Sequence, residues 1–127
     1  MNCPSSIRLI DMKTLRFDEI RIEAVSGGIF TGEVGIQRIV NEGMGSRDLR
    51  ISLVSFPPGI RNTWHTHDSD QCLWILDGRG VVASEEGEVT AEPGMAFFIP
   101  AGESHWHGAA ENSHFSHISI IGGTRPA

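Results

Sequence analysis

Several residue types that mark large classes of protein are scarce in this chain. Only two of its 127 residues are cysteines, which is too few for the disulfide framework of a small secreted domain. No apolar run approaches the roughly 18 residues that a membrane-spanning helix needs. The N-terminus also lacks a basic stretch followed by an apolar one, so no export signal is visible. We therefore expect a cytoplasmic protein without a membrane partner.

Basic residues are scarce as well. The formal net charge is −6, with 10 Lys and Arg residues against 16 Asp and Glu. Nucleic-acid binding needs a basic stripe that neutralises phosphates, and the sequence has none. We expect a small-molecule partner and no nucleic acid. A chain of this length buries about two thirds of its surface, which is enough for one domain without disulfide staples.

Turn-forming residues recur along the whole chain. The 15 glycines and 6 prolines separate short apolar segments, and helix signals are few. This pattern is typical of an antiparallel all-β domain. Residues 11–19 can form at most a turn or two of helix. Strands are predicted over residues 7–10, 20–25, 34–40, 49–56, 60–66, 71–76, 79–84, 87–92, 95–99, 104–108 and 114–121.

A His-x-His pair is the most informative motif. Side chains alternate along a strand, so His65 and His67 are expected to face the same side. Gln71 keeps that parity four residues on, and His105 comes from a different predicted strand. Three imidazoles and one amide oxygen can hold a divalent transition metal while leaving positions open for another molecule. We predict that the metal ligands are His65, His67, Gln71 and His105.

The spacing of these residues resembles both sequence motifs of the cupin superfamily. The first motif is matched by Gly59, His65, His67, Gln71 and Gly78. The second is matched by Gly94, Pro100, Gly102 and His105. Gln71 stands where the motif usually has a glutamate, which leaves a bound metal with more net positive charge. Ala109 stands where it usually has an asparagine, a position that is not normally a ligand.

The resemblance implies a fold and an arrangement of the chain. Cupins are antiparallel jelly-roll β-barrels, one of the few ways in which such short strands close over an interior pocket. We assign residues 46–127 to the barrel core. Residues 1–45 are expected to be N-terminal strands or an extension of the same domain, at a dimer interface. The resemblance also implies a homodimer or homotetramer.

Within the superfamily, the chain is similar to small monocupins. The similarity runs from about Phe30 to Ile121 and includes the run from Ile99 to Ala109 together with His117. The chain resembles carboxymuconolactone decarboxylase-associated cupins, some of whose relatives are manganese-dependent hydroxynitrile lyases. That resemblance implies manganese as the metal, with iron, nickel, zinc and cobalt as alternatives.

Two further histidines favour an enzyme. His107 shares strand parity with His105, and His117 on the last predicted strand can point into the same cavity. Neither is needed to bind metal, so both are candidates for proton transfer near neutral pH. The alternative is that they only support the ligands through hydrogen bonds. Thr63 and Arg61 are assigned to substrate binding by the same parity, although an arginine on a strand is usually solvated.

The remaining conspicuous residues have structural interpretations. The three tryptophans have the parity opposite to the site residues, so they are expected in an outer layer or a subunit interface. His114 is expected in solvent. The run 97–99 (Phe-Phe-Ile) is expected in the core.

The preferred function is Lewis-acid catalysis with histidine acid/base assistance, of a lyase or isomerase type. A hydroxynitrile lyase is what the resemblance implies. The first alternative is a non-haem dioxygenase, because the same ligands can bind a redox-active metal with adjacent open positions. The second is a non-catalytic module that binds a metal or a small ligand.

Overall fold

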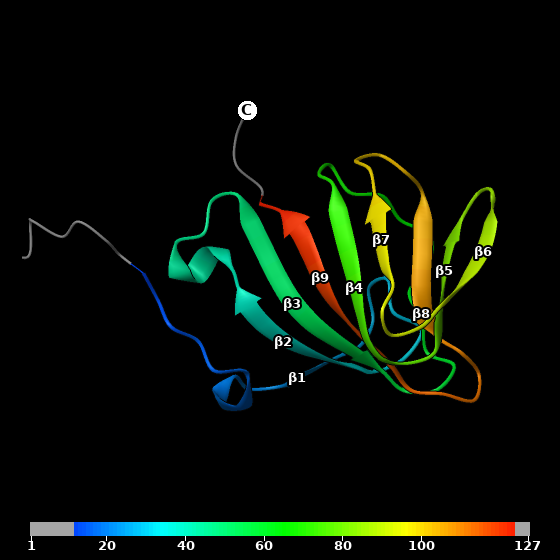
Figure 1. Ribbon diagram of the computed structural model, residues 1–127, viewed down its shortest axis with the longest axis horizontal. Helices are drawn as coiled ribbons and strands as arrows, with labels where there is room; N and C mark the ends of the chain where they lie inside the picture. Colours follow the sequence, from blue (N-terminus) through cyan, green and yellow to red (C-terminus); the bar gives the residue numbers. More distant parts are fainter. Residues whose placement is uncertain (1–11, 124–127) are drawn as a thin grey trace, which may run out of the picture.

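The computed structural model describes residues 12–123. Within this range, nine strands form two antiparallel sheets, and the all-β prediction is confirmed. The broad sheet has the order β1-β2-β3-β9-β4-β7, and the small sheet has the order β6-β5-β8 (Figure 1). The strands are β1 (Glu23–Val25), β2 (Val34–Val40), β3 (Leu49–Phe56), β4 (Gln71–Gly78), β5 (Gly80–Ser84), β6 (Gly87–Ala91), β7 (Ala96–Ile99), β8 (His105–Ala109) and β9 (Phe115–Gly122).

Helix is confined to single turns. The 3₁₀ helix η2 (Phe17–Glu19) falls inside the stretch for which a short helical turn was predicted, and η3 (Glu42–Met44) links β2 to β3. No helix among residues 12–123 is long and apolar enough to cross a membrane. The predicted strand over 7–10 lies outside the described residues, and the one over 20–25 is reduced to β1.

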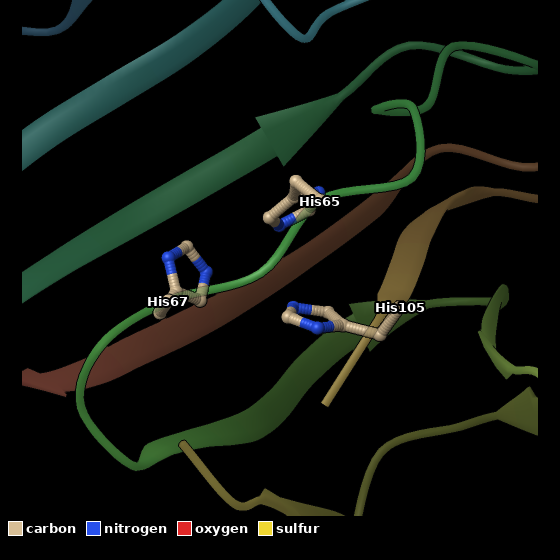
Figure 2. Close-up of side chains that lie close together, drawn as sticks. All are labelled: His65, His67 and His105. Atoms are coloured by element: carbon tan, nitrogen blue, oxygen red, sulfur yellow. The ribbon is translucent and has the colours of Figure 1, made fainter. Parts of the chain in front are cut away.

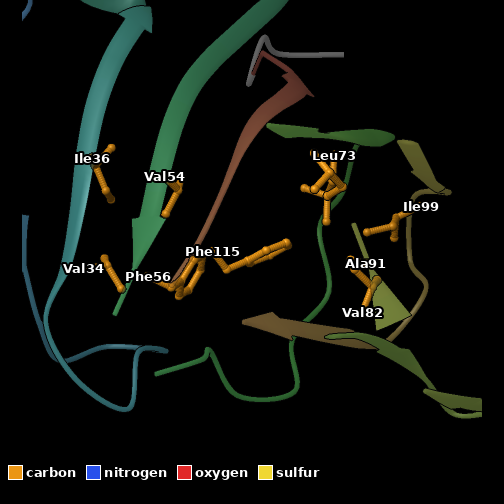
Figure 3. Packing of buried hydrophobic residues seen from close by; sticks show 10 residues of the cluster. Val34, Ile36, Val54, Phe56, Leu73, Val82, Ala91, Ile99 and Phe115 are labelled. Carbon is orange, nitrogen blue, oxygen red and sulfur yellow. The ribbon is translucent and has the colours of Figure 1, made fainter. Parts of the chain in front are cut away.

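The core lies between the two sheets and follows the alternation of the strands. In β4, Leu73 and Ile75 are buried while Trp74 between them is exposed, as period-2 geometry requires. The buried cluster draws on both sheets (Figure 3), and its members are Val34, Ile36, Val54, Phe56, Leu73, Ile75, Val82, Ala91, Ile99 and Phe115. The same inward faces carry the polar residues described below.

Two predicted turns have the expected backbone geometry. Gly78 ends β4 with φ 76°, and Gly94 precedes β7 with φ 93°. Positive φ is strained for residues that carry a Cβ. At Gly78 a Cβ would also collide with the backbone carbonyl oxygen of His114. Glycine is therefore required at the junction that brings β9 alongside β4.

The predicted strand over 60–66 is wrong in detail. This segment forms only isolated bridges, Arg61 with Gly108 and His65 with His105 on one side and Asn62 with Phe30 on the other. The chain bends at Trp64, which interrupts the ladder. The segment still reaches β8 closely, because Gly108 has no side chain and a Cβ there would overlap Arg61. This close approach carries the His-x-His pair to the small sheet.

The expectation that residues 97–99 are all core is also wrong at one position. Phe98 is 68% exposed, whereas Ile99 is 6% exposed. In β7, Phe97 and Ile99 point toward the core and Phe98 points away from it, because successive strand side chains face opposite sides. Three consecutive apolar residues in a strand therefore cannot all be buried against one core.

Candidate metal centre

Three histidines meet at one point between the sheets. His65 and His67 come from the segment before β4, and His105 is the first residue of β8. Their possible ligand atoms all lie within 4.8 Å of one another. The ring centroids are 4.3 Å apart for His65 and His105, and 4.9 Å apart for His65 and His67 (Figure 2). The structure therefore brings together the three imidazoles that the sequence singled out.

Backbone carbonyls fix the protonated nitrogen on two of these rings. His65 Nδ1 lies 2.6 Å from the Thr63 carbonyl oxygen, and His105 Nδ1 lies 2.9 Å from the Glu103 carbonyl oxygen. A carbonyl oxygen only accepts hydrogen bonds, so Nδ1 must donate in both cases. When the rings are neutral, Nε2 of each therefore carries a lone pair. This is the usual way in which proteins orient metal-binding imidazoles.

Gln71 adds an oxygen beside the histidines. Its Nε2 donates to Ser119 Oγ at 2.9 Å, which leaves Oε1 as the free end of the amide. Oε1 of Gln71, Nε2 of His67 and Nε2 of His105 are all buried without a hydrogen-bond partner in the described part of the chain. Buried polar atoms without partners are costly. A divalent cation contacting these atoms would satisfy them together, so the donor set fits a metal.

The electrostatics of the cluster favour neutral rings. Burial lowers the pKa of His65, and burial together with the charges of His65, His105 and Arg50 lowers the pKa of His67 to about 4. The neighbouring Gln71 side chain opposes the lowering at His67. Lone pairs on neutral imidazoles are what a metal requires. The lowered pKa values of His65 and His67 therefore favour the neutral form of each ring, which can bind a cation.

The second pair of histidines lies next to this cluster. His107 and His117 are both buried, with ring centroids 4.9 Å apart. Burial is the main cause that lowers the pKa of His107 well below its ordinary value and that of His117 to about 4. Both rings are neutral at pH 7. His107 Nδ1 and both ring nitrogens of His117 have no hydrogen-bond partner among residues 12–123, so they can act on a bound molecule.

Asn62 holds His107 in place, a role that the sequence analysis missed. Asn62 Oδ1 accepts from the His107 backbone N–H at 2.8 Å, so its Nδ2 must face His107 Nε2, 3.3 Å away. That nitrogen then accepts, and the His107 proton sits on Nδ1. In the sequence, Asn62 is only a polar residue near the His-x-His pair. Its even number predicts a side chain that faces away from His65 and His67, so alternation along a strand gives no reason to select it.

These side chains surround a cavity of about 230 Å³. His65, His67, Gln71, His107 and His117 all line it, and its apolar wall is formed by Phe30, Ile36, Val54 and Phe56. The volume is suited to a small organic molecule rather than a polymer. Three of the four predicted ligands and both predicted proton carriers thus line one cavity.

The two residues assigned to substrate binding lie elsewhere, and this assignment is corrected. The guanidinium carbon of Arg61 lies 3.8 Å from the ring centroid of Trp106, a stacking contact. Thr63 is exposed, and its backbone N–H donates to Ile29. Neither lines the cavity. The bend at Trp64 is the reason, because the buried position shifts from Asn62 before it to His65 after it.

The tryptophans and the remaining histidine lie away from the cavity. Trp64 and Trp74 are 47% and 57% exposed, whereas Trp106 is buried beneath Arg61. His114 is exposed and pairs with Asp77 at 2.9 Å. The expectation that His114 faces solvent is confirmed.

Comparison with known proteins agrees with this geometry. The cupin-domain family model matches residues 52–121. An (R)-mandelonitrile lyase from Granulicella tundricola is 41% identical over 68 residues, which are 53% of this chain and 52% of that protein. The chain thus spans about half the length of this relative.

Solved structures show the same fold. A cupin-like protein from Thermotoga maritima is 32% identical with a TM-score of 0.72, over 76% of this chain and 74% of that one. The polyketide cyclase RemF from Streptomyces resistomycificus has a TM-score of 0.80 at 18% identity, over 92% of this chain and 83% of that one, which is a likeness of fold alone. The cupin-domain match spans more than half of the sequence and contains all four predicted ligands, so the chain belongs to the cupin family.

Proposed function

We propose that the protein is a metal-dependent lyase that cleaves small hydroxynitriles to an aldehyde and hydrogen cyanide, with Mn²⁺ as the metal. The observation that carries this proposal is a set of unpartnered donor atoms on His67, His105 and Gln71 next to a cavity that also exposes unpartnered nitrogens of His107 and His117. Similarity to the (R)-mandelonitrile lyase supplies the reaction class.

The residues that would hold the metal are His65, His67, His105 and Gln71. A bound divalent metal supplies Lewis acidity that lowers the pKa of a hydroxyl in contact with it. None of these four residues is a carboxylate. The Lewis acidity of the metal therefore stays high, because no negatively charged ligand offsets the charge of the cation.

Cleavage of a hydroxynitrile requires one proton to move and one carbon–carbon bond to break. Neutral His117 accepts the hydroxyl proton as the carbonyl forms and the bond to cyanide breaks. The buried imidazolium that results is a strong acid, because burial disfavours its charge. It returns the proton to the departing cyanide, and the atoms balance. His107 Nδ1–H donates a hydrogen bond to the same leaving group.

We expect racemic mandelonitrile to be cleaved by the Mn²⁺-loaded protein and not by the metal-free protein. Benzaldehyde release is followed by absorbance, and chiral chromatography reports which enantiomer is consumed. The control variant His114→Ala lacks a histidine outside the cluster and is expected to behave as the parent does. Activity with Zn²⁺ as well as Mn²⁺ would exclude obligatory redox chemistry. No cleavage with any bound metal would overturn the proposal, and oxygen consumption only with iron would favour the dioxygenase.

We expect His117→Ala to keep its metal and lose about 100-fold or more in kcat, because positioned acid/base groups contribute on this scale. Metal content is measured by mass spectrometry on the same preparation, and KM is compared separately. Loss of kcat with little change in metal content distinguishes proton transfer from a structural role. Normal turnover in this variant would remove His117 from the mechanism.

A further inference from the structure

One charged side chain in the cavity has no counterpart in the proposed chemistry. Arg50 lies on β3 opposite Ile121 of β9 and lines the same cavity as the histidines. Its Nε is buried without a hydrogen-bond partner in the described part of the chain. Its Nη2 makes one long contact, 3.4 Å, to the Gly122 carbonyl oxygen. No carboxylate among residues 12–123 forms an ion pair with it.

The rest of the cavity wall offers Arg50 no negative charge. Among residues 12–123, no aspartate or glutamate lines the cavity, although the chain carries 16 acidic residues and a net charge of −6. Arg38 lines it too, but it is half-exposed and already paired with Glu23 at 3.4 Å. The usual glutamate ligand is replaced by Gln71. The cavity is therefore positively charged, and a bound divalent metal would make it more so.

The charge of Arg50 reaches the metal cluster. It contributes to the lowering of the His67 pKa, which places the guanidinium within electrostatic range of that ring. A partly buried guanidinium without a counter-ion is unfavourable, and its planar fork of N–H donors matches a carboxylate. An anion that contacts Arg50 would offset this unpaired charge.

We propose that Arg50 binds a carboxylate of the substrate, so that the natural substrate is a small organic acid carrying a second oxygen for the metal cluster. The inference shares the metal centre of the proposed function and goes beyond its reaction, because it assigns Arg50 to an anionic substrate that binds at the same centre. The carbon skeleton of that acid would pack on the apolar wall formed by Phe30, Ile36, Val54 and Phe56. A hydroxy acid or a keto acid meets these requirements, whereas mandelonitrile lacks the negative charge.

The test compares two probes that differ in charge. Mandelate and mandelamide have the same skeleton and hydroxyl, and their binding to Mn²⁺-loaded protein is measured by calorimetry. We expect mandelate to bind at least about 10-fold more tightly, and Arg50→Gln to weaken mandelate by about 10- to 100-fold, the range for a charge-assisted contact. Mandelamide affinity is expected to change by less than about two-fold. Arg47→Gln, which removes an exposed charge three residues away, is the matched control.

A second variant guards against a folding defect. Arg50→Lys keeps the positive charge but loses the two parallel N–H donors of the guanidinium. We therefore expect this variant still to bind mandelate more tightly than mandelamide, with a smaller ratio of affinities than in the parent protein. Circular dichroism and metal content are recorded for every variant. Equal affinity of the parent protein for the two probes, no measurable mandelate binding, or unchanged mandelate affinity in Arg50→Gln would each overturn the inference.

The same preparations separate this inference from the proposed function. Mandelonitrile cleavage and mandelate binding are measured separately, because the first reports the lyase reaction and the second reports the anion site. If mandelonitrile is cleaved but mandelate binding does not depend on Arg50, the inference fails and the lyase proposal stands. If mandelate binding depends on Arg50 but mandelonitrile is never cleaved, the anion site stands and the lyase proposal fails.

Discussion

Replacing His105 with alanine is expected to abolish metal binding and, with it, activity. His105 is the only one of the three clustered histidines that is fully buried, and its Nε2 has no partner in the described part of the protein. Its ring is oriented by the Glu103 carbonyl, so little freedom is lost when a metal binds. Losing an outer-shell partner already weakens metal binding by about 10- to 100-fold. Losing a ligand is therefore expected to weaken it by more than about 100-fold.

Mass spectrometry of protein dialysed against Mn²⁺ measures this effect, and calorimetric titration gives the affinity. The control is His114→Ala, because His114 is an exposed histidine paired only with Asp77. Circular dichroism checks that the His105→Ala protein remains folded. Full metal occupancy in folded His105→Ala protein would show that the cation binds elsewhere, and the proposed centre would then be wrong.

The positions of most strands were accessible from the sequence because apolar alternation and turn residues are local signals. Leu73 and Ile75 are buried and Trp74 is exposed, as the pattern of that segment predicts. The convergence of His65, His67 and His105 was inferred from motif spacing, and the structure places them together. Spacing succeeded here because the glycines of the motif, Gly78 among them, fix where strands turn.

The failures concern residues whose direction depends on contacts far away in the sequence. Arg61 and Thr63 were placed in the cavity by counting parity through a segment that bends at Trp64. Asn62 is buried instead, at 2% exposure, because it bridges to Phe30 and bonds His107. Counting odd and even positions assumes a regular strand. The neighbouring residues in the sequence do not indicate where the regular strand ends.

Arg50 was missed for a different reason. Its strand, β3, alternates well enough for the sequence to place it correctly, but an arginine near a strand end is usually solvated. What distinguishes Arg50 is that no carboxylate among residues 12–123 forms an ion pair with it and that its Nε is buried. Both depend on which residues of other strands surround it, so they appear only in three dimensions.

The stability of the metal-free protein is expected to fall steeply as the pH is lowered from about 6.5 to about 4. An unfolded histidine has a pKa of about 6.5, whereas burial lowers that of His117 to about 4 in the folded state. Between these values the unfolded chain binds a proton that the folded chain does not. Stability is therefore fully present above pH 6.5 and is lost as the pH falls, by up to about 1.4 kcal/mol per pH unit for this residue.

Urea unfolding at pH steps between 7 and 4, with chelator present, measures the slope of the free energy of unfolding. The slope measures how many more protons the unfolded chain binds than the folded protein. We expect this number to be smaller by close to one in His117→Phe, because phenylalanine does not titrate. The phenylalanine ring would still pack against Phe56 and Phe115. His114→Gln, at an exposed site outside the cavity, is the matched control. An identical slope in the parent and in His117→Phe would mean that His117 titrates normally in the folded protein. It could then not be the desolvated base that the proposed reaction requires.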